Sequence, residues 1–391
     1  MSTGSTTLPF PARAHTVEAD HAEHPTRVRT RTANAIVYCE ANFGAMDGKT
    51  ANGLVRHSEK YAIRSIVDST QAGADAGVAL GEAANGIPIH ASVAAAIGAL
   101  GYAPDFFIFG MAPSSGVLSP VERDVVLDAI ARGMNVVNGL HEFLNDDPEF
   151  AAAAVLHDVE ILDVRRPRDK KDLQMFSGRI ASVTCPRIAV LGTDGAIGKR
   201  TTATILTQAL NDRGIKALLV GTGQTGLIQG ARYGVALDAI PCQFCSGEME
   251  RAIVEAFDAE HPDVIIVEGQ GALSHPAYLT SSFILRGAQP QAVILQHAPA
   301  REVLGDFPAV AMPTPPSEIN LIETFATTKV IGLTINHEHM TDADVTAAID
   351  RYEAELGIPA TDALTRSPDR LVSMVTDAFP ALRERLTAPT P

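Results

Sequence analysis

The feature that most constrains this chain is the glycine-rich stretch GTDGAIGKRTT at residues 192–202. It follows an apolar run and opens into a segment whose apolar residues recur at helical spacing, which predicts a strand, a turn and a helix. Gly195 and Gly198 suit this turn because a phosphate lies against bare backbone N–H groups that a side chain would block. A helix beginning near Lys199 points unpaired N–H groups and its positive dipole end at the anion. The stretch therefore predicts a phosphate-binding P-loop.

The turn departs from the G-x-x-x-x-G-K-[ST] pattern in two places. Gly192 lies one residue further from the Gly-Lys pair than the pattern asks, and Arg200 follows the lysine, which displaces the hydroxyls to Thr201 and Thr202. The hydroxyl directly after the lysine normally holds Mg²⁺, so Arg200 leaves that role to Thr201 and weakens the case for ordinary ATP hydrolysis. A glycine turn that binds nothing is the alternative, and a lysine in register argues against it.

Length and composition bound the remaining possibilities. A chain of 391 residues that is 46% hydrophobic predicts two domains with substantial cores. A net charge of −15 argues against nucleic-acid and membrane partners. No apolar stretch is long enough to span a membrane and residues 1–32 lack a signal-peptide core, so we expect a cytoplasmic protein. Four cysteines are too few for a disulfide framework, and we interpret Cys242 and Cys245 as partly buried thiols rather than metal ligands.

Residues 1–32 show no periodicity and predict a mobile, disordered tail, with the fold beginning near Ala33. From there to residue 184 strands alternate with helices, which predicts a doubly wound, mostly parallel sheet. The predicted strands are 35–39, 62–67, 106–109, 135–137 and 159–162, and the predicted helices are 91–100, 121–132 and 150–156. The strand ends nominate residues 40–42, 68–70, 110–113 and 138–141 as crevice loops. No G-x-G-x-x-G follows the first strand, so no nicotinamide cofactor is predicted.

A basic segment at residues 163–180 connects the two halves. It holds Arg165, Arg166, Arg168, Lys170 and Lys171 in an otherwise acidic chain. Two interpretations stay open: a solvated linker, as charge runs usually are, or a carboxylate clamp at Arg165 or Arg166.

The second half, residues 185–391, again alternates strand with helix. The predicted strands after the P-loop are 216–220, 264–267, 292–295 and 329–335, and the predicted helices are 318–325, 343–356 and 368–386. The glycine-rich ends 221–226 and 268–271 should converge on the P-loop because all follow parallel strands of one sheet. A carboxylate at such an end is where Mg²⁺ on a phosphate would be held, which nominates Glu268 and Asp194. His337 and His339 have no third ligand near in sequence, so no metal is predicted there.

Six segments carry a resemblance to a known family. They are NVVNGLHEFLNDDPEF (135–150), DVRRP (163–167), GTDGAIGKRTT (192–202), GTGQTG (221–226), EGQGALSHPAY (268–278) and LRGAQPQAVIL (285–295). Together they resemble a two-domain family with a Rossmann-like N-terminal half and a P-loop C-terminal half, whose named members are D-glutamate N-acetyltransferases. The resemblance implies an α/β fold of two doubly wound domains, the second P-loop NTPase-like, and acetyl transfer from acetyl-CoA to the amine of an acidic D-amino acid. Arg200 and the long N-terminal tail depart from the family pattern.

This implied reaction gives the candidate residues chemical roles. Coenzyme A carries a diphosphate that the P-loop could cradle without a metal, which makes acetyl-CoA the expected cofactor. The expected donor-binding residues are Gly192, Thr193, Asp194, Gly195, Gly198, Lys199, Arg200, Thr201, Thr202, Gln224, Thr225 and Asn336. His275 is the candidate base, with Glu268 as its alternative, and Tyr278 could protonate the leaving thiolate. Arg165, Arg166 and His141 are the expected acceptor-binding residues. The acceptor, most simply D-glutamate, should bind where the two halves meet, and we expect a homo-oligomer.

Two alternatives remain open on sequence alone. GTDGAIGK also resembles dethiobiotin synthetase, which implies ATP-dependent carboxylate activation with Lys199, Thr201 and Glu268 around Mg-ATP and Asn336 on the adenine. A non-catalytic nucleotide-binding regulator would keep the P-loop but would need no converging base or carboxylate.

Overall fold

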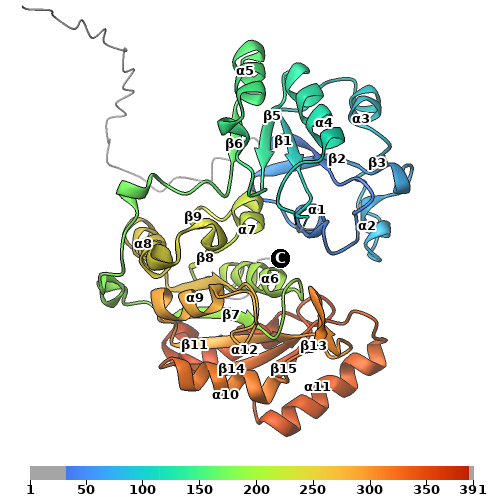
Figure 1. Cartoon of the computed structure of the whole chain (residues 1–391). Helices are drawn as coiled ribbons and strands as arrows, with labels where there is room; N and C mark the ends of the chain where they lie inside the picture. Colours follow the sequence, from blue (N-terminus) through green and yellow to red (C-terminus); the bar gives the residue numbers. More distant parts are fainter. Residues whose placement is uncertain (1–31, 114, 387–391) are drawn as a thin grey trace, which may run out of the picture. The chain divides into compact units, whose positions relative to one another are not determined.

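The computed structural model describes residues 32–113 and 115–386. The tail predicted at residues 1–32 therefore lies outside the described residues, apart from Thr32. Two parallel sheets dominate the described chain, the first built before residue 164 and the second after residue 186 (Figure 1).

The first sheet has the strand order β3-β2-β1-β4-β5-β6, and every pairing in it is parallel. This is the order of a Rossmann-like domain, in which the sequence doubles back beside the first strand. Its strands are β1 (Ala33–Tyr38), β2 (Tyr61–Val67), β3 (Ile89–His90), β4 (Phe106–Phe109), β5 (Asn135–Asn138) and β6 (Ile161–Asp163). Its helices are α1 (Lys49–Arg56), α2 (Ala76–Ala79), α3 (Val93–Leu100), α4 (Pro120–Ala131) and α5 (Pro148–His157).

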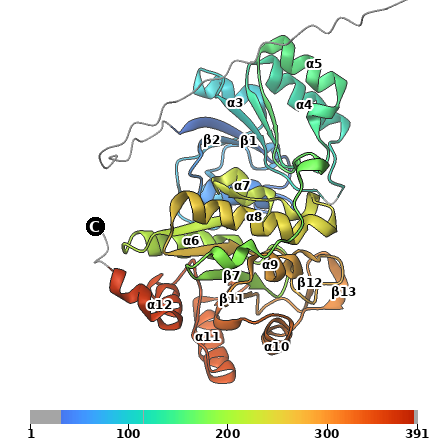
Figure 2. The same ribbon diagram turned by 90° about the vertical axis from the view of Figure 1, so that its left-hand side faces the viewer.

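Local sequence explains where the helices begin. α4 starts at a capping box in which Ser119 and Glu122 exchange side-chain and backbone hydrogen bonds, followed by a proline in the first turn. α5 likewise starts with an Asp147 cap and a proline, and α4 and α5 lie side by side (Figure 1 and Figure 2).

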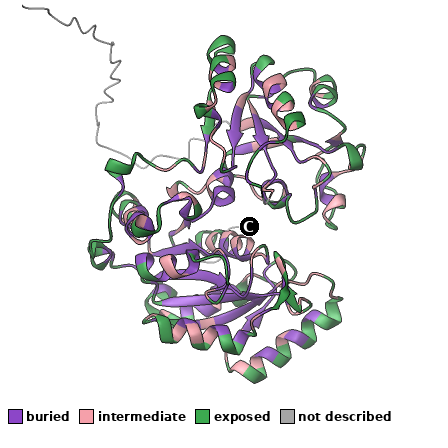
Figure 3. Cartoon of the chain, in the orientation of Figure 1, coloured by how far each residue is buried: buried purple, intermediate pink, exposed green. Residues whose placement is uncertain are grey.

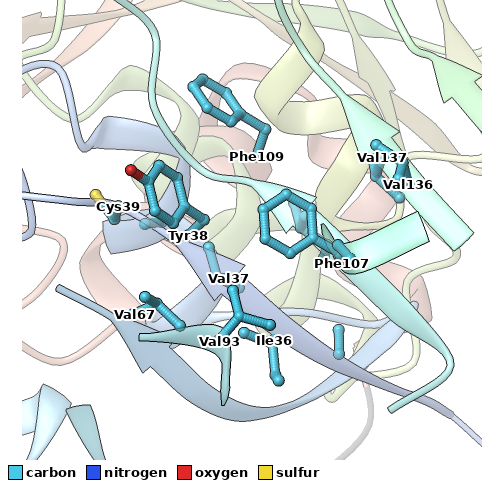
Figure 4. Close-up of a cluster of buried hydrophobic side chains, with 14 of the residues drawn as sticks. Ile36, Val37, Tyr38, Cys39, Val67, Val93, Phe107, Phe109, Val136 and Val137 are labelled. Atoms are coloured by element: carbon cyan, nitrogen blue, oxygen red, sulfur yellow. The ribbon is translucent and has the colours of Figure 1, made fainter. Parts of the chain in front are cut away.

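The core of the first domain is centred on β1, which lies between β2 and β4 and is buried along its last four residues. The Tyr38 ring packs against Phe107 and Phe109, with centroid separations of 6.0 and 5.7 Å (Figure 4). Ile228, from the second half of the chain, is also part of this core cluster. The first domain is therefore completed by a residue that the second half supplies.

The second sheet has the strand order β15-β14-β11-β7-β10-β8-β9, again all parallel. Its strands are β7 (Arg187–Gly192), β8 (Ala217–Gly221), β9 (Tyr233–Gly234), β10 (Val264–Glu268), β11 (Ala292–His297), β14 (Lys329–Ile335) and β15 (Ala360–Thr361). A short antiparallel hairpin pairs β12 (Val303–Leu304) with β13 (Phe307–Ala311).

Helices cover both faces of this sheet, because alternate residues of its strands point to opposite sides. In β7, Ile188 and Val190 pack with α6 (Lys199–Asn211) and α12 (Asp369–Ala378), whereas Ala189 and Leu191 belong to the opposite cluster. That cluster includes α8 (Cys242–Glu260), α9 (Thr280–Ala288), α10 (Pro315–Phe325) and α11 (Asp342–Leu356). The strands of both sheets are buried and the outward helix faces are exposed (Figure 3). The predicted fold class, two doubly wound α/β domains, is confirmed.

Five described helices were not predicted from periodicity: α1, α2, α7 (Gln224–Gln229), α8 and α9. α1 and α7 are short and rich in glycine and polar residues, so neither has an apolar pattern long enough to predict a helix. The predicted single helix at 368–386 is wrong, because α12 ends at Ala378 and Pro380 opens a separate 3₁₀ segment. Cys242 and Cys245 lie in the first turn of α8, where Cys242 is exposed and Cys245 is buried, so only one of the two thiols fits the predicted burial.

α1 and α7 connect the two halves of the chain through hydrogen bonds. The Thr50 and Thr225 hydroxyl oxygens are 2.9 Å apart in a buried hydrogen bond. Gln229 Nε2 donates to the backbone oxygens of Gly53 at 2.6 Å and His57 at 2.7 Å. These contacts fix the first domain against the end of β8. Within residues 32–113 and 115–386, no helix combines the length and apolarity needed to cross a membrane.

Candidate functional site

A cavity of about 1350 Å³ is lined by both halves of the chain. The second half contributes the P-loop and the segments after β8 and β10, so the predicted convergence of three strand ends is confirmed by their position. The first half contributes residues 44–47, 112–113 and 139–141. The predicted crevice loops 40–42 and 68–70 do not line the cavity. Instead they bond to each other, with Ser69 N donating to Glu40 Oε2 at 2.9 Å.

The P-loop leaves the N-terminus of α6 without an internal cap. Gly198 is the N-cap residue, with a left-handed φ of 101°, and no side chain caps the helix. A side chain at Gly195 would meet nothing within 4 Å, so packing does not require a glycine there. Both features suit an anion that fills this space and accepts the free N–H groups.

Lys199 is buried beneath this turn. Its Nζ donates to the backbone oxygen of Asp194. Burial lowers the pKa of the Lys199 ammonium to about 7, although the Asp194 carboxylate opposes the shift. A phosphate would supply the negative charge that this buried cation lacks.

Arg200 points toward the first domain. Its Nη2 lies so close to Gly53 of α1 that a Cβ on that residue would collide with it. Burial lowers the pKa of the Arg200 guanidinium, and Glu268 partly opposes this. Among the hydrogen bonds of the described residues, none involves the Arg200 side chain, so its donors remain available to a ligand.

The other predicted P-loop residues divide into free and committed groups. Thr201 lines the cavity, and its hydroxyl makes no hydrogen bond to another described residue. Thr202 donates to Gln296 Oε1 at 2.6 Å, and Thr193 Oγ1 lies 2.9 Å from His297 Nδ1. Gly192 and Thr193 do not line the cavity, so of the predicted turn residues these two serve the fold.

Asp194 is a clamp rather than an open metal ligand. Its Oδ1 accepts from Gly195 N at 2.6 Å, and its Oδ2 accepts from Arg301 Nη1 at 3.0 Å and Gly305 N at 2.9 Å. Arg301 also pairs with Glu338. The clamp ties the P-loop to the β12–β13 hairpin and engages both carboxylate oxygens of Asp194, which disfavours its predicted metal role.

Glu268 ends β10, the strand next to β7, and is buried in the cavity wall. Its Oε2 accepts from Thr222 N at 3.1 Å. Burial raises the pKa of the Glu268 carboxyl, although the Arg200 guanidinium opposes the shift. A Cβ on Gly226 would collide with this carboxylate, which explains the glycine at that position of α7.

His275 is buried and does not line the cavity. Its Nδ1 accepts from Ala277 N at 3.2 Å and Tyr278 N at 3.1 Å, so in the neutral ring Nε2 carries the proton. Nε2 is buried without a hydrogen-bond partner among the described residues, 4.0 Å from Asp194 Oδ1. With its lone pair already used, His275 lacks the free acceptor that a general base needs.

Tyr278 lines the cavity, and its ring stacks on His275 with centroids 4.3 Å apart. Its hydroxyl donates to Asp306 Oδ2 at 2.7 Å. Burial, and then this carboxylate, raises the pKa of the Tyr278 hydroxyl to about 12. Such a hydroxyl releases its proton reluctantly, so it is a poor acid for a thiolate.

Three further predicted donor residues lie in the cavity wall: Gln224, Thr225 and Asn336. The Thr225 hydroxyl is engaged with Thr50. Asn336 donates to the backbone oxygen of Ile197 at 3.1 Å and accepts from Glu338 N at 2.9 Å. Its amide therefore positions the P-loop, and the adenine-reading role expected in the ATP alternative would require it to leave those bonds.

Of the predicted acceptor residues, Arg165 and His141 line the cavity and Arg166 does not. Arg165 is buried, with Nε donating to Gly139 O at 2.6 Å and Nη1 paired with Asp238. Burial, and then Arg165, lowers the pKa of the His141 imidazole. Arg166 instead pairs with Asp146 at 2.8 Å and Asp163 at 3.5 Å. The structure thus places Arg166 in an ion-pair cluster of the first domain, away from the predicted site.

Sequence reasoning missed Lys49, the first residue of α1, which lines the cavity. Burial, and then the charge of Arg165, lowers the pKa of the Lys49 ammonium. Its Nζ makes no hydrogen bond or ion pair with a side chain of the described residues. The available signal was its place at the start of the first helix after the first strand, next to the switch point of the sheet. In the part of the chain that the structure describes, no group of three or more His, Cys, Asp or Glu side chains is arranged to hold a metal ion.

The fold and the site define a two-domain protein in which a Rossmann-like half and a P-loop half share one cavity. Two family models match it: a Rossmann-like domain of unknown function, DUF1611_N, over residues 69–167, and a P-loop domain of unknown function, DUF1611, over residues 174–372. The chain belongs to this DUF1611 family.

Named relatives and a solved structure agree with this assignment. A D-glutamate N-acetyltransferase from a Pseudoalteromonas species is 31% identical over 274 residues, covering 68% of this chain and 80% of that protein. Another from Tritonibacter scottomollicae is 32% identical over 277 residues, covering 68% and 79%. The crystal structure of a DUF1611 family protein from Anabaena variabilis ATCC 29413 matches with a TM-score of 0.81 at 31% identity, over 88% of this chain and 99% of that chain. The predicted resemblance is confirmed, and it supports an acetyltransferase at the level of the family.

Proposed function

We propose that this protein transfers the acetyl group of acetyl-CoA to the amine of an acidic amino acid, with D-glutamate as the acceptor. The observation that carries the proposal is a single cavity with uncommitted cations on both walls: Arg200 with the free α6 N-terminus on one, and Lys49 on the other. The names of the two relatives support the reaction type and the acceptor.

The donor's diphosphate would lie on the P-loop. The free N–H groups of α6, the Lys199 ammonium and the Arg200 guanidinium all bind phosphate oxygens, and none of them needs a metal. Gly195 supports this placement because the space beside it is open. The thioester would then extend from the diphosphate into the cavity.

The acceptor's carboxylates would lie against Lys49 and Arg165. Arg165 keeps Nη2 available after its bonds to Gly139 and Asp238, and Lys49 is near enough for the two charges to repel. Two carboxylates would relieve that repulsion, which favours glutamate over an amino acid with an apolar side chain. His141 is the third acceptor residue in this proposal.

The reaction needs a base and a place for the oxyanion. The acceptor ammonium gives one proton to a base, and its nitrogen attacks the thioester carbon and gives up a second proton as the C–S bond breaks. The released thiolate takes one of these two protons, and the other leaves to solvent. Glu268 is the better base of the two candidates, because its raised pKa increases its proton affinity and its carboxylate lines the cavity. Backbone N–H groups of residues 269–271, which also line the cavity, are candidates for holding the oxyanion.

One observation favours the ATP-dependent alternative. Thr201 and Glu268 both line the cavity, and the Thr201 hydroxyl is uncommitted, so these two could hold Mg²⁺ on a nucleotide phosphate. Against this alternative, Arg200 occupies the position directly after the lysine, where an ordinary P-loop has the hydroxyl that binds Mg²⁺.

Thiol release distinguishes the two functions. Purified protein with acetyl-CoA should release CoA thiol when D-glutamate is added, more slowly with L-glutamate, and at the same rate after exhaustive EDTA treatment. A matched reaction with D-leucine controls for acceptor charge. Dependence on Mg-ATP, with no thiol release from acetyl-CoA, would overturn the proposal and favour the alternative.

A further inference from the structure

A second cavity, of about 240 Å³, runs along one face of α6 and adjoins the main one. Its α6 wall is formed by residues at helical spacing, Thr201, Thr204, Ile205, Gln208 and Ala209, followed by the C-cap residue Asp212. We name this cavity the α6 groove. Arg56, Arg200, Thr201 and Leu364 line both cavities, so the groove begins where the P-loop wall ends.

The groove suits a flat heterocycle with a charged neighbour. Ile205, Ala209, Leu364 and Pro368 give it apolar walls, and Arg56 lies at its junction with the main cavity. Arg56 Nε donates to Glu82 Oε1 at 2.6 Å, and its two terminal nitrogens make no hydrogen bond to another described residue. A base would therefore have apolar faces to lie on, with a cation available for a phosphate on its sugar.

Gln229 adds a specific hydrogen-bonding group to this groove. It is buried, and its Nε2 donates to two backbone oxygens, of Gly53 and His57, which fixes the orientation of the amide. Its Oε1 is buried and has no hydrogen-bond partner among the described residues. A buried acceptor without a donor is costly, so this atom suits a ligand that brings an amine.

We propose that the α6 groove binds the adenosine end of the donor, with the exocyclic amine of adenine donating to Gln229 Oε1 and the ribose phosphate against Arg56. The inference rests on the acetyl-CoA donor proposed above. It follows from continuity, because a diphosphate on the P-loop connects the thioester arm in the main cavity to the adenosine in the groove. ATP would present the same base and diphosphate but no ribose 3′-phosphate.

Filling the groove tests this placement. Gln208→Trp is suitable because Gln208 is exposed and bonds only to Asp212 Oδ1, at 3.0 Å, so the fold should tolerate the change. Ala354→Trp on α11, also exposed and in neither cavity wall, is the matched control. By titration calorimetry, Gln208→Trp should bind CoA at least 10-fold more weakly than the parent and Ala354→Trp should bind it equally. Both variants should leave the affinity for 4′-phosphopantetheine, which lacks adenosine, unchanged.

Ligand analogues test the individual contacts. In the parent protein, 3′-dephospho-CoA should bind several-fold more weakly than CoA, and this difference should vanish in Arg56→Ala. ADP should bind more tightly than IDP, which lacks the exocyclic amine. Equal binding of CoA by Gln208→Trp and the parent, or of ADP and IDP, would overturn the placement.

The outcomes separate this inference from the proposed function. If the parent binds ADP but not CoA, and Gln208→Trp weakens ADP, the groove is an adenine site and the acetyl-CoA proposal falls. If CoA binds and Gln208→Trp changes nothing, the acetyl-CoA proposal stands and the groove inference falls. Binding of neither nucleotide overturns both.

Discussion

Two basic clusters stand out in this chain, and they differ in how their charges are used. In the segment between the two sheets, Arg165 pairs with Asp238, Arg166 with Asp146 and Asp163, and Arg168 with Glu248. At the P-loop, the Lys199 ammonium reaches only a backbone oxygen and the Arg200 side chain makes no hydrogen bond to another described residue. Arg166 and Arg168 of the first cluster hold the protein together and Arg165 keeps only one terminal nitrogen for a ligand, whereas the second cluster is left for an anion.

The comparison shows that a basic residue indicates a ligand site only when its own hydrogen-bond and ion-pair partners are known. An ion pair inside the protein offsets the charge that a ligand would otherwise neutralise. The P-loop cations lack such pairs, and burial lowers the pKa of both the Lys199 ammonium and the Arg200 guanidinium. The site is thus built from cations without carboxylate partners, and four changes test this difference between the two clusters.

The largest effect is expected from Lys199→Ala, which removes a cation from the uncommitted cluster. A charged hydrogen bond contributes about 1.5–3 kcal/mol, so CoA affinity should fall roughly 10- to 150-fold. Titration calorimetry measures it. Lys216→Ala is the control, because Lys216 is exposed, paired with Glu260 and outside both cavities. Unchanged CoA affinity in Lys199→Ala would show that the donor does not bind at the P-loop.

The fold was largely predictable from the sequence, because buried parallel strands leave continuous apolar runs. β4 and β14 were predicted at the ends that the structure shows. α1 and α7 were not, because each is short and its buried residues are largely glycines and polar residues that contact the other half of the chain, such as Gln229 with Gly53.

The site was predictable only where local sequence determines it. A glycine turn before a helix fixes the place of Gly198 and Lys199, whatever the rest of the chain does. The roles of the arginines depend on partners distant in sequence: Asp238 lies 73 residues from Arg165, and Glu248 lies 80 residues from Arg168. His275 is excluded as the base because its Nδ1 accepts hydrogen bonds from two backbone N–H groups. No sequence pattern predicts these bonds.

The second prediction contrasts an uncommitted cation with a paired one. Lys49→Ala should raise the KM for D-glutamate about 10-fold or more, from the loss of one charged hydrogen bond, and leave the KM for acetyl-CoA nearly unchanged. Arg166→Ala should leave both values at the parent level, because its partners are Asp146 and Asp163. Steady-state kinetics decides between them. If Arg166→Ala raises the KM for D-glutamate and Lys49→Ala does not, the acceptor binds at the basic segment and not at Lys49.

The third prediction displaces Arg200 without removing it. A Cβ at Gly53 would meet the Arg200 guanidinium, whereas a Cβ at Gly98 in α3 would meet nothing within 4 Å. Alanine in place of a helical glycine stabilises the fold by about 0.5–1 kcal/mol, so Gly98→Ala should keep or raise the melting temperature, whereas in Gly53→Ala the displacement of Arg200 and Gln229 offsets that gain. Only Gly53→Ala should bind CoA more weakly, by roughly 3- to 10-fold, since a displaced guanidinium loses part of a charged hydrogen bond. Equal CoA affinity in both variants would show that Arg200 does not contact the donor.

The smallest effect is a pH dependence that belongs to Lys199. Burial lowers the pKa of the Lys199 ammonium to about 7, so in the empty site this side chain loses its positive charge as the pH rises through 7. Above that pH, Lys199 must take up a proton when an anion binds. Affinity for CoA should therefore fall about three-fold between pH 6.5 and 7.5, with proton uptake measurable by calorimetry in buffers of different ionisation enthalpy. Lys199→Arg is the matched control, because a guanidinium stays protonated across this range. It should bind CoA without that proton uptake and with a flatter pH profile. An equally steep profile in Lys199→Arg would assign the titration to another group, such as a phosphate of the ligand, and leave the lysine charged in both states.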